Sequence, residues 1–137
     1  MDIKRFLDAQ QRDYETALRE IRNGHKQSHW IWYVFPQIAG LGYSSMSRYY
    51  AIENLEEARE YLAHPVLRAR LLEISKALLD LKKDNPAEVM GYPDDMKLRS
   101  SMTLFMLAAP DEPVFGAVID RFYHGIPDEK TIELAKK

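Results

Sequence analysis

Three hydroxyl side chains interrupt an otherwise apolar helical segment in the second half of the chain. They are Ser100, Ser101 and Thr103, and two cations, Lys97 and Arg99, come just before or beside them. Serine and threonine are weak helix formers, because their hydroxyls compete for backbone partners. Such a cluster could hold a phosphate or carboxylate, with arginine gripping it through its planar fork. The alternative is an internal polar network that fixes helix packing.

An aromatic segment, residues 28–37, is the second place where chemistry could occur. It contains both tryptophans of the chain, and its candidate site residues are Ser28, His29, Trp32 and Gln37. Tryptophan and tyrosine rings can stack on a flat ligand such as a nucleobase. The alternative is that the rings fill the core and that His29 is a hydrogen-bonded core histidine.

A turn rich in glycine and serine follows, with Gly42 and Ser44 as its candidate site residues. Exposed backbone N–H groups near hydroxyls suit a phosphate or another anion. The turn lacks the Gly-Lys-Ser of a P-loop, and no strand precedes it, so it matches neither that loop nor a dinucleotide fingerprint. A plain glycine turn is the alternative.

The candidate general bases are His29 and Asp95, either of which could activate a water molecule. His25 lies four residues before His29, but Gly24 and Ser28 argue against a regular helix there. No third ligand is spaced to complete a metal site, and no Gly-x-Ser-x-Gly nucleophile elbow is present. We therefore expect neither a metal nor a cofactor.

Helices are expected to position these residues within one domain that spans residues 1–137. Apolar residues recur at helical spacing from Ile3 to Asn23. The segment 28–35 fits a short buried helix or a strand, and the absence of a second strand to pair with it favours a helix. Capping signals predict the other elements. They are a short helix after Ser44 or Ser45, a helix at 54–63 capped by Asn54, a helix at 65–81 that follows the capping or turn residue His64, helices at 94–109 and from Asp111 to Gly125, a turn at 85–91, and a last helix capped by Asp128. His124 is expected to be a charge partner for the end of the helix before it. The expected fold is all-α, with about seven helices in orthogonal or solenoid-like pairs.

Composition narrows the class of protein. The chain has 137 residues, 46% hydrophobic and 29% charged, which suits one globular core. It has no cysteine, which excludes disulfides, thiolate nucleophiles and zinc–thiolate sites. The N-terminus has no signal-peptide pattern and no stretch approaches the roughly 18 apolar residues of a membrane span, so we expect a cytoplasmic protein without membrane contact. The net charge of −2, without a basic stripe, predicts no nucleic-acid partner.

Five segments together resemble the bacterial family called domain of unknown function 1810, which some genome descriptions label calpastatin. They are Ser-His-Trp-Ile-Trp-Tyr-Val-Phe-Pro-Gln (28–37), Gly-Leu-Gly-Tyr-Ser (40–44), Tyr-Tyr-Ala-Ile (49–52), Tyr-Leu-Ala-His-Pro-Val-Leu (61–67) and Lys-Leu-Arg-Ser-Ser-Met-Thr-Leu-Phe (97–105). The resemblance implies an all-helical fold in a bacterial cytosol and no particular activity. A weaker likeness, of general layout, is to NADAR-type proteins, helical domains tied to NAD and ADP-ribose metabolism.

Two functions remain open at this point. The first is a pocket for a small phosphorylated or nucleotide-like ligand, extended to ADP-ribose-related hydrolysis if His29 or Asp95 acts as a base. The second is a non-catalytic helical module that binds other proteins, with Trp30, Trp32 and Arg99 as core or interface anchors. The first requires the motif segments to meet at one concave pocket, and the second requires an exposed apolar patch. Neither fixes an oligomeric state.

Overall fold

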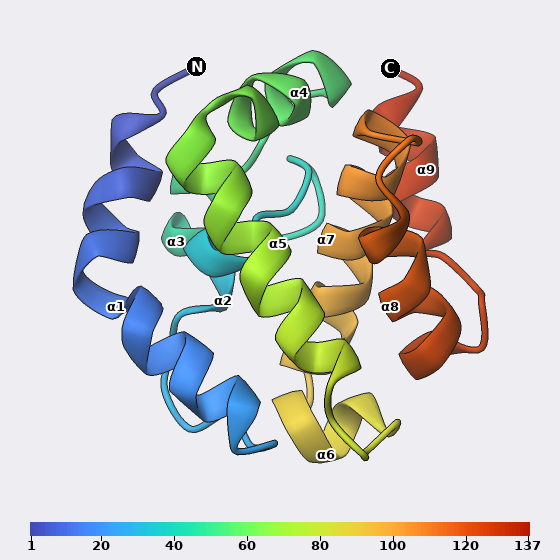
Figure 1. The fold of residues 1–137 in the computed structure, drawn as a ribbon. Coiled ribbons are helices and arrows are strands. Elements are labelled where there is room, and N and C mark those ends of the chain that lie inside the picture. The colour runs from blue at the N-terminus through green and yellow to red at the C-terminus, as the bar shows by residue number, and fades with distance from the viewer.

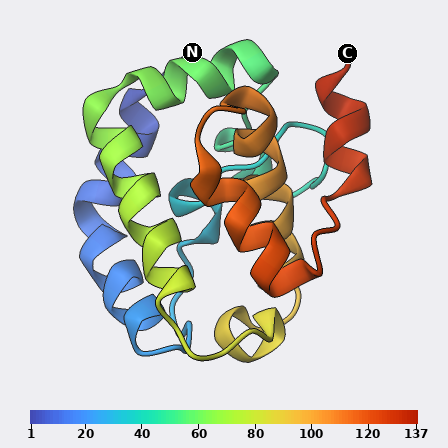
Figure 2. The same cartoon turned by 45° about the vertical axis from the view of Figure 1, so that its right-hand side comes forward.

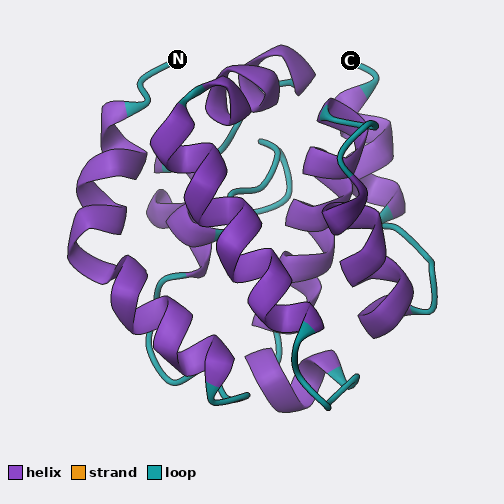
Figure 3. Ribbon diagram, viewed as in Figure 1, coloured by secondary structure: helices purple, strands orange, loops and turns teal.

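Nine helices form the regular structure of residues 1–137 in the computed structural model, which describes the whole chain (Figure 1). They are α1 (Lys4–Arg22), α2 (Ile31–Val34), α3 (Ser45–Tyr49), α4 (Leu55–Ala63), α5 (Pro65–Leu79), α6 (Pro86–Met90), α7 (Asp94–Ala108), α8 (Pro113–Tyr123) and α9 (Glu129–Ala135). Helices and loops alone are visible in Figure 3, and one isolated bridge joins Ile38 to Ile52. The all-α class is confirmed.

The expected number of about seven helices is too low. Short helices were expected at 28–35 and after Ser44, where α2 and α3 lie, but α6 was not expected as a helix. α2, α3 and α6 have four or five residues each, which is too few for a clear periodic pattern. The segment from Asn85 to Gly91 was expected to be a turn, but it contains α6. Asn85 accepts a hydrogen bond from the backbone N–H of Ala87 at 2.9 Å, and Pro86 occupies the first helical position. Both features favour the start of a helix.

α7 is the central helix and packs against α2, α4, α6, α8 and α9. Its buried side chains include Leu98, Met102, Leu104 and Phe105, each fully enclosed. Ser100, Ser101 and Thr103 are buried on the same helix, so most of the circumference of α7 beyond its first turn is enclosed by protein. Repeats in a solenoid contact only their neighbours, so the packing of α7 on α2 and α4 rules out the solenoid-like arrangement (Figure 2).

Most predicted caps are confirmed. The side chains of Ser44, Asn54, His64 and Asp128 each accept a hydrogen bond from a backbone N–H in the first turn of the helix that follows. The helix expected from Asp111 instead begins at Pro113 without a side-chain cap, because proline supplies the first helical position by itself.

α8 ends at Tyr123, close to the expected end at Gly125. His124 has a φ of 55° and lies in the left-handed region just beyond the helix, so it is the C-cap residue and not a side chain of the last turn. Gly125 continues this turn with a φ of 75°, which glycine adopts without strain. None of the nine helices combines the length and the hydropathy that crossing a membrane requires.

Candidate functional site

A pocket of about 480 Å³ lies between the segment 32–42, which contains the end of the aromatic segment and the glycine turn, and the start of the segment 97–105. Its wall is built from α2, the loop at 37–42, α3, the segment 50–53 and the first turns of α7 and α9. The predicted site residues that line it are Trp32, Gln37, Gly42, Lys97 and Arg99. The volume falls within the range of about 300–1,000 Å³ that is typical of small-molecule sites.

The pocket wall carries more positive than negative charge. Its cations are Arg48, Lys97, Arg99 and Lys130, and its carboxylates belong to Glu53 and Asp128. The difference, four minus two, is a net charge of +2 on a chain whose overall charge is −2. A concave site of one sign attracts ligands of the other, so this wall favours an anion.

Arg99 is held in place by groups outside the pocket. Its Nε donates a hydrogen bond to the carbonyl oxygen of Ile126 at 2.8 Å, and its guanidinium lies over the ring of Tyr123, 5.6 Å from the centroid. Arg99 makes no ion pair with Asp94 or Asp95. The terminal N–H groups of the guanidinium therefore remain free for a bidentate contact with an anion.

Arg48 and Lys130 differ from Arg99 because no protein group holds them. Both side chains line the pocket and are exposed, and neither forms an ion pair or a hydrogen bond within the chain. Their removal would therefore change the charge of the pocket without breaking an internal contact.

Residues 40–42 of the glycine turn line the same pocket wall. Its start is fixed by two hydrogen bonds, from Ala39 N to the Ile52 oxygen at 2.8 Å and from Ile52 N to the Gln37 oxygen at 2.9 Å. The next three N–H groups, at residues 40–42, donate to no acceptor in the chain. A Cβ at Gly42 would lie only 2.5 Å from the Ser47 hydroxyl, so the close approach of this turn to α3 requires glycine. Consecutive free N–H groups form an anion-binding concavity.

The hydroxyls of α7 have a structural task. Ser100 Oγ donates to the Met96 oxygen at 3.1 Å or to Asp128 Oδ2 at 3.2 Å. Thr103 Oγ1 donates to the Arg99 oxygen at 2.8 Å and accepts from Asp128 N at 2.9 Å. These bonds dock the start of α9 on α7, which completes one side of the pocket.

Ser101 and Thr103 do not line the pocket. Ser101 is 0% exposed and its hydroxyl has no hydrogen-bond partner. Ser44 is occupied as the cap of α3, where it accepts from Ser47 N at 3.1 Å. The two serines that line the pocket wall are Ser47 and Ser100.

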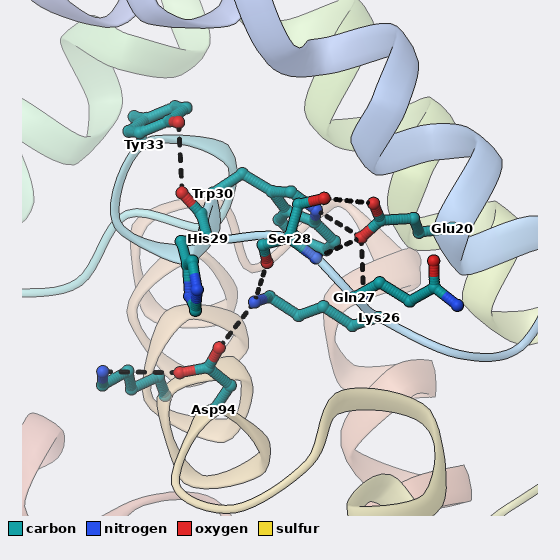
Figure 4. A network of polar contacts seen from close by, with 9 residues as sticks. Glu20, Lys26, Gln27, Ser28, His29, Trp30, Tyr33 and Asp94 are labelled. Carbon is teal, nitrogen blue, oxygen red and sulfur yellow. Dashed lines mark hydrogen bonds and ion pairs between the residues drawn. The ribbon is translucent and has the colours of Figure 1, made fainter.

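Ser28 forms hydrogen bonds to a buried carboxylate on α1, that of Glu20 (Figure 4). Glu20 is 7% exposed, and its oxygens accept from Gln27 N at 2.8 Å, Ser28 N at 2.9 Å, Ser28 Oγ at 2.6 Å and Trp30 Nε1 at 2.9 Å. Burial raises the pKa of this carboxyl, but the hydrogen bonds from Ser28, Gln27 and Trp30 outweigh it and lower the pKa to about 2. Ser28 therefore positions the aromatic segment and lies outside the pocket wall.

The two candidate general bases also lie outside the pocket wall. His29 is exposed, and its side chain forms no hydrogen bond. Asp95 is half-buried, with one carboxylate oxygen that lacks a partner, and its backbone oxygen accepts from the hydroxyl of Tyr123. No cluster of three or more histidine, aspartate or glutamate side chains in the chain is arranged to hold a metal ion.

The sequence analysis did not identify Arg48, Lys130 and Asp128 as pocket residues, or Glu20 as the residue that binds the segment before α2. Arg48 and Lys130 gave no signal beyond their charge, since exposed cations are common on helices. Glu20 did give one: it follows Ala17 by three residues and precedes Ile21, so it falls on the buried face of α1. A lone carboxylate on an apolar helix face needs buried donors.

Comparisons with known proteins identify relatives whose function is not described. The model of the family described as "Protein of unknown function (DUF1810)" matches residues 1–135. The crystal structure of the conserved hypothetical protein Rv1873 from Mycobacterium tuberculosis is similar with a TM-score of 0.97 and 41% identity, over 99% of this chain and 97% of that one. No curated protein matches the chain. The resemblance seen in the sequence motifs is confirmed, and the chain belongs to the DUF1810 family of proteins of unknown function.

Proposed function

We propose that this protein binds a small phosphorylated, nucleotide-like anion in the pocket at the start of α7. The observation that carries the proposal is the excess of cations in the pocket wall, which has four cationic side chains and two carboxylates. The volume of the pocket also suits a small molecule. The free N–H groups of residues 40–42 add neutral donors to that charge. Phosphate oxygens accept hydrogen bonds from both kinds of group.

An apolar part of the wall would take the uncharged end of the ligand. Trp32, Ile38, Leu41, Tyr50 and Met96 contribute to it. Flat rings bind well against aromatic and thioether side chains. This mixture supports a ligand with a ring or sugar attached to the phosphate over a bare inorganic ion.

The proposal stops at binding and does not include hydrolysis. His29 and Asp95, the bases on which an ADP-ribose-related hydrolysis would depend, are not part of the pocket wall. One oxygen of Asp128 is already occupied by Thr131 and Ser100. Among the wall carboxylates, Glu53 alone is exposed and accepts no hydrogen bond.

A thermal-shift titration tests the proposal. The panel contains inorganic phosphate, pyrophosphate, ribose 5-phosphate, AMP, NAD and ADP-ribose. A compound present at 100 times its dissociation constant stabilises the fold by about 2.7 kcal/mol, which raises the melting temperature of a domain of this size by about 10 °C. We expect such a rise with at least one phosphorylated compound.

Charge variants locate the binding. Arg48→Gln removes a pocket cation that no protein group holds, and we expect it to weaken binding about tenfold, since neutralising one close charge contact costs about 1.4 kcal/mol. Arg19→Gln is the matched control, because Arg19 is an exposed arginine of α1 outside the pocket. Equal losses in both variants would show that the anion binds through general surface charge and would contradict the proposal.

A further inference from the structure

A buried lysine, Lys26, is linked through Asp94 to the pocket cation Lys97. Lys26 precedes α2, and its side chain is only 5% exposed. Its Nζ is 2.7 Å from Asp94 Oδ2, lies 4.8 Å from the centroid of the Trp30 ring, and also donates to the backbone oxygen of Ser28 (Figure 4). Lysine is rarely enclosed to this degree unless its charge is paired. Asp94 supplies the paired charge for Lys26.

Asp94 has a second cationic partner, and that partner belongs to the pocket. Its Oδ1 is 3.4 Å from the Nζ of Lys97, one turn further along α7. Lys97 lines the pocket, and its ammonium lies 5.0 Å from the centroid of the Trp32 ring. One carboxylate therefore bridges two lysines, the first enclosed by protein and the second facing the ligand space.

The charges of Lys26, Asp94 and Lys97 together determine how strongly Lys97 can attract an anion. Asp94 is outside the pocket wall, but at 3.4 Å it would cancel most of the charge of Lys97 and lower the effective charge of the pocket from +2 to +1. Lys26 is closer to Asp94 than Lys97 is, and it offsets that carboxylate. With Lys26 in place, the ammonium of Lys97 remains available to an anion.

The backbone around Lys26 is fixed on two sides. Its own N–H donates to the oxygen of Val89 at 2.7 Å, which ties it to α6. On the other side, Glu20 holds residues 27, 28 and 30 through the four hydrogen bonds described above. The lysine is thus held opposite Asp94 by contacts that do not involve the pocket.

We propose that Lys26 is a positioning residue of the anion pocket, which neutralises Asp94 so that Lys97 can bind a phosphate group. This inference rests on the proposed function. Lys26 lies outside the pocket wall, and its charge would increase the affinity for the anion in addition to its contribution to folding.

The test is the dissociation constant for inorganic pyrophosphate, measured by isothermal titration calorimetry on the full chain. We expect Lys26→Met to raise the constant about tenfold. The double variant Lys26→Met, Asp94→Asn removes the carboxylate as well, and we expect it to return to within about threefold of the unsubstituted protein. Removing both members of a buried pair is far less disruptive than removing one, so the double variant is expected to fold.

Circular dichroism and the melting temperature establish that each variant is folded before titration. If Lys26→Met does not fold, Lys26→Gln replaces it, because the glutamine amide can still donate to the oxygen of Ser28. Unchanged affinity in the single variant would overturn the inference. Equal weakening in the single and double variants would also overturn it, since the role of Lys26 would then be structural. If the unsubstituted protein binds neither pyrophosphate nor any compound of the thermal-shift panel, the proposed function itself fails.

Discussion

Replacing Glu20 by glutamine is expected to lower the free energy of unfolding at pH 7 by about 2 kcal/mol, because a buried charged acceptor is replaced by a neutral one. The carboxylate accepts four hydrogen bonds from Gln27, Ser28 and Trp30. Hydrogen bonds to a charged acceptor contribute more than neutral ones. A glutamine amide can accept only through its oxygen, so with that oxygen at the Oε1 position its NH₂ group would face the Ser28 hydroxyl that donates to Oε2.

The cost of this substitution should depend on pH. The pKa of Glu20 is about 2 in the folded protein, below the ordinary value of 4.5. The stability that comes from its charge is therefore complete above about pH 4.5 and is lost as the pH falls toward 2. We expect the difference between the two proteins at pH 3 to be less than half of that at pH 7.

Urea unfolding at both pH values measures this difference. Glu15→Gln is the matched control on α1, because Glu15 is exposed, and its effect should stay within about 0.5 kcal/mol. A Glu20→Gln difference that is the same at pH 3 and pH 7 would mean that the ionised carboxylate is not what holds the aromatic segment.

Asp128→Ala is expected to destabilise the protein by about 2–4 kcal/mol and to release α9. Asp128 Oδ2 accepts from Thr131 N at 3.1 Å and from Thr131 Oγ1 at 2.5 Å. Loss of a helix cap costs about 1 kcal/mol. Thr131 is fully buried, so its hydroxyl would also be left without a partner, which costs a further 1–3 kcal/mol.

Hydrogen exchange of the α9 amides, combined with urea unfolding, measures this effect. Faster exchange should be confined to α9 and the residues just before it, because the rest of α7 keeps its packing. Glu133→Ala is the control, since Glu133 is an exposed residue of the same helix. Unchanged exchange in α9 would show that the Asp128 network does not hold this wall of the pocket.

The sequence predicted the helices well where local chemistry decides their ends. Asn54, His64 and Asp128 act within one turn of their own position, so each cap could be inferred from neighbouring residues alone. The bounds of α4 were predicted correctly for the same reason. α6 was missed as a helix, because five residues carry no period.

The candidate site could be predicted only in part, because the roles of its residues depend on partners far along the chain. Ser28 and Trp30 were interpreted as site or core residues, yet both bind Glu20 on another helix. Thr103 is four residues from the pocket cation Arg99, and its hydroxyl joins the Arg99 backbone oxygen to the backbone N–H of Asp128, 25 residues away. Trp32 and Arg99 were predicted correctly, and both line the pocket.

The most direct test of the proposed anion pocket is a titration of the protein with pyrophosphate and AMP, followed by ¹H–¹⁵N NMR spectra. We predict that the backbone signals of residues 40–42 and the indole signal of Trp32 shift progressively with ligand. The shallow groove between α1 and α5, which includes Arg22 and Lys76, provides the comparison within the same molecule. Shifts that are largest at that groove, or spread evenly over exposed cations, would contradict the assignment of the pocket as the anion site.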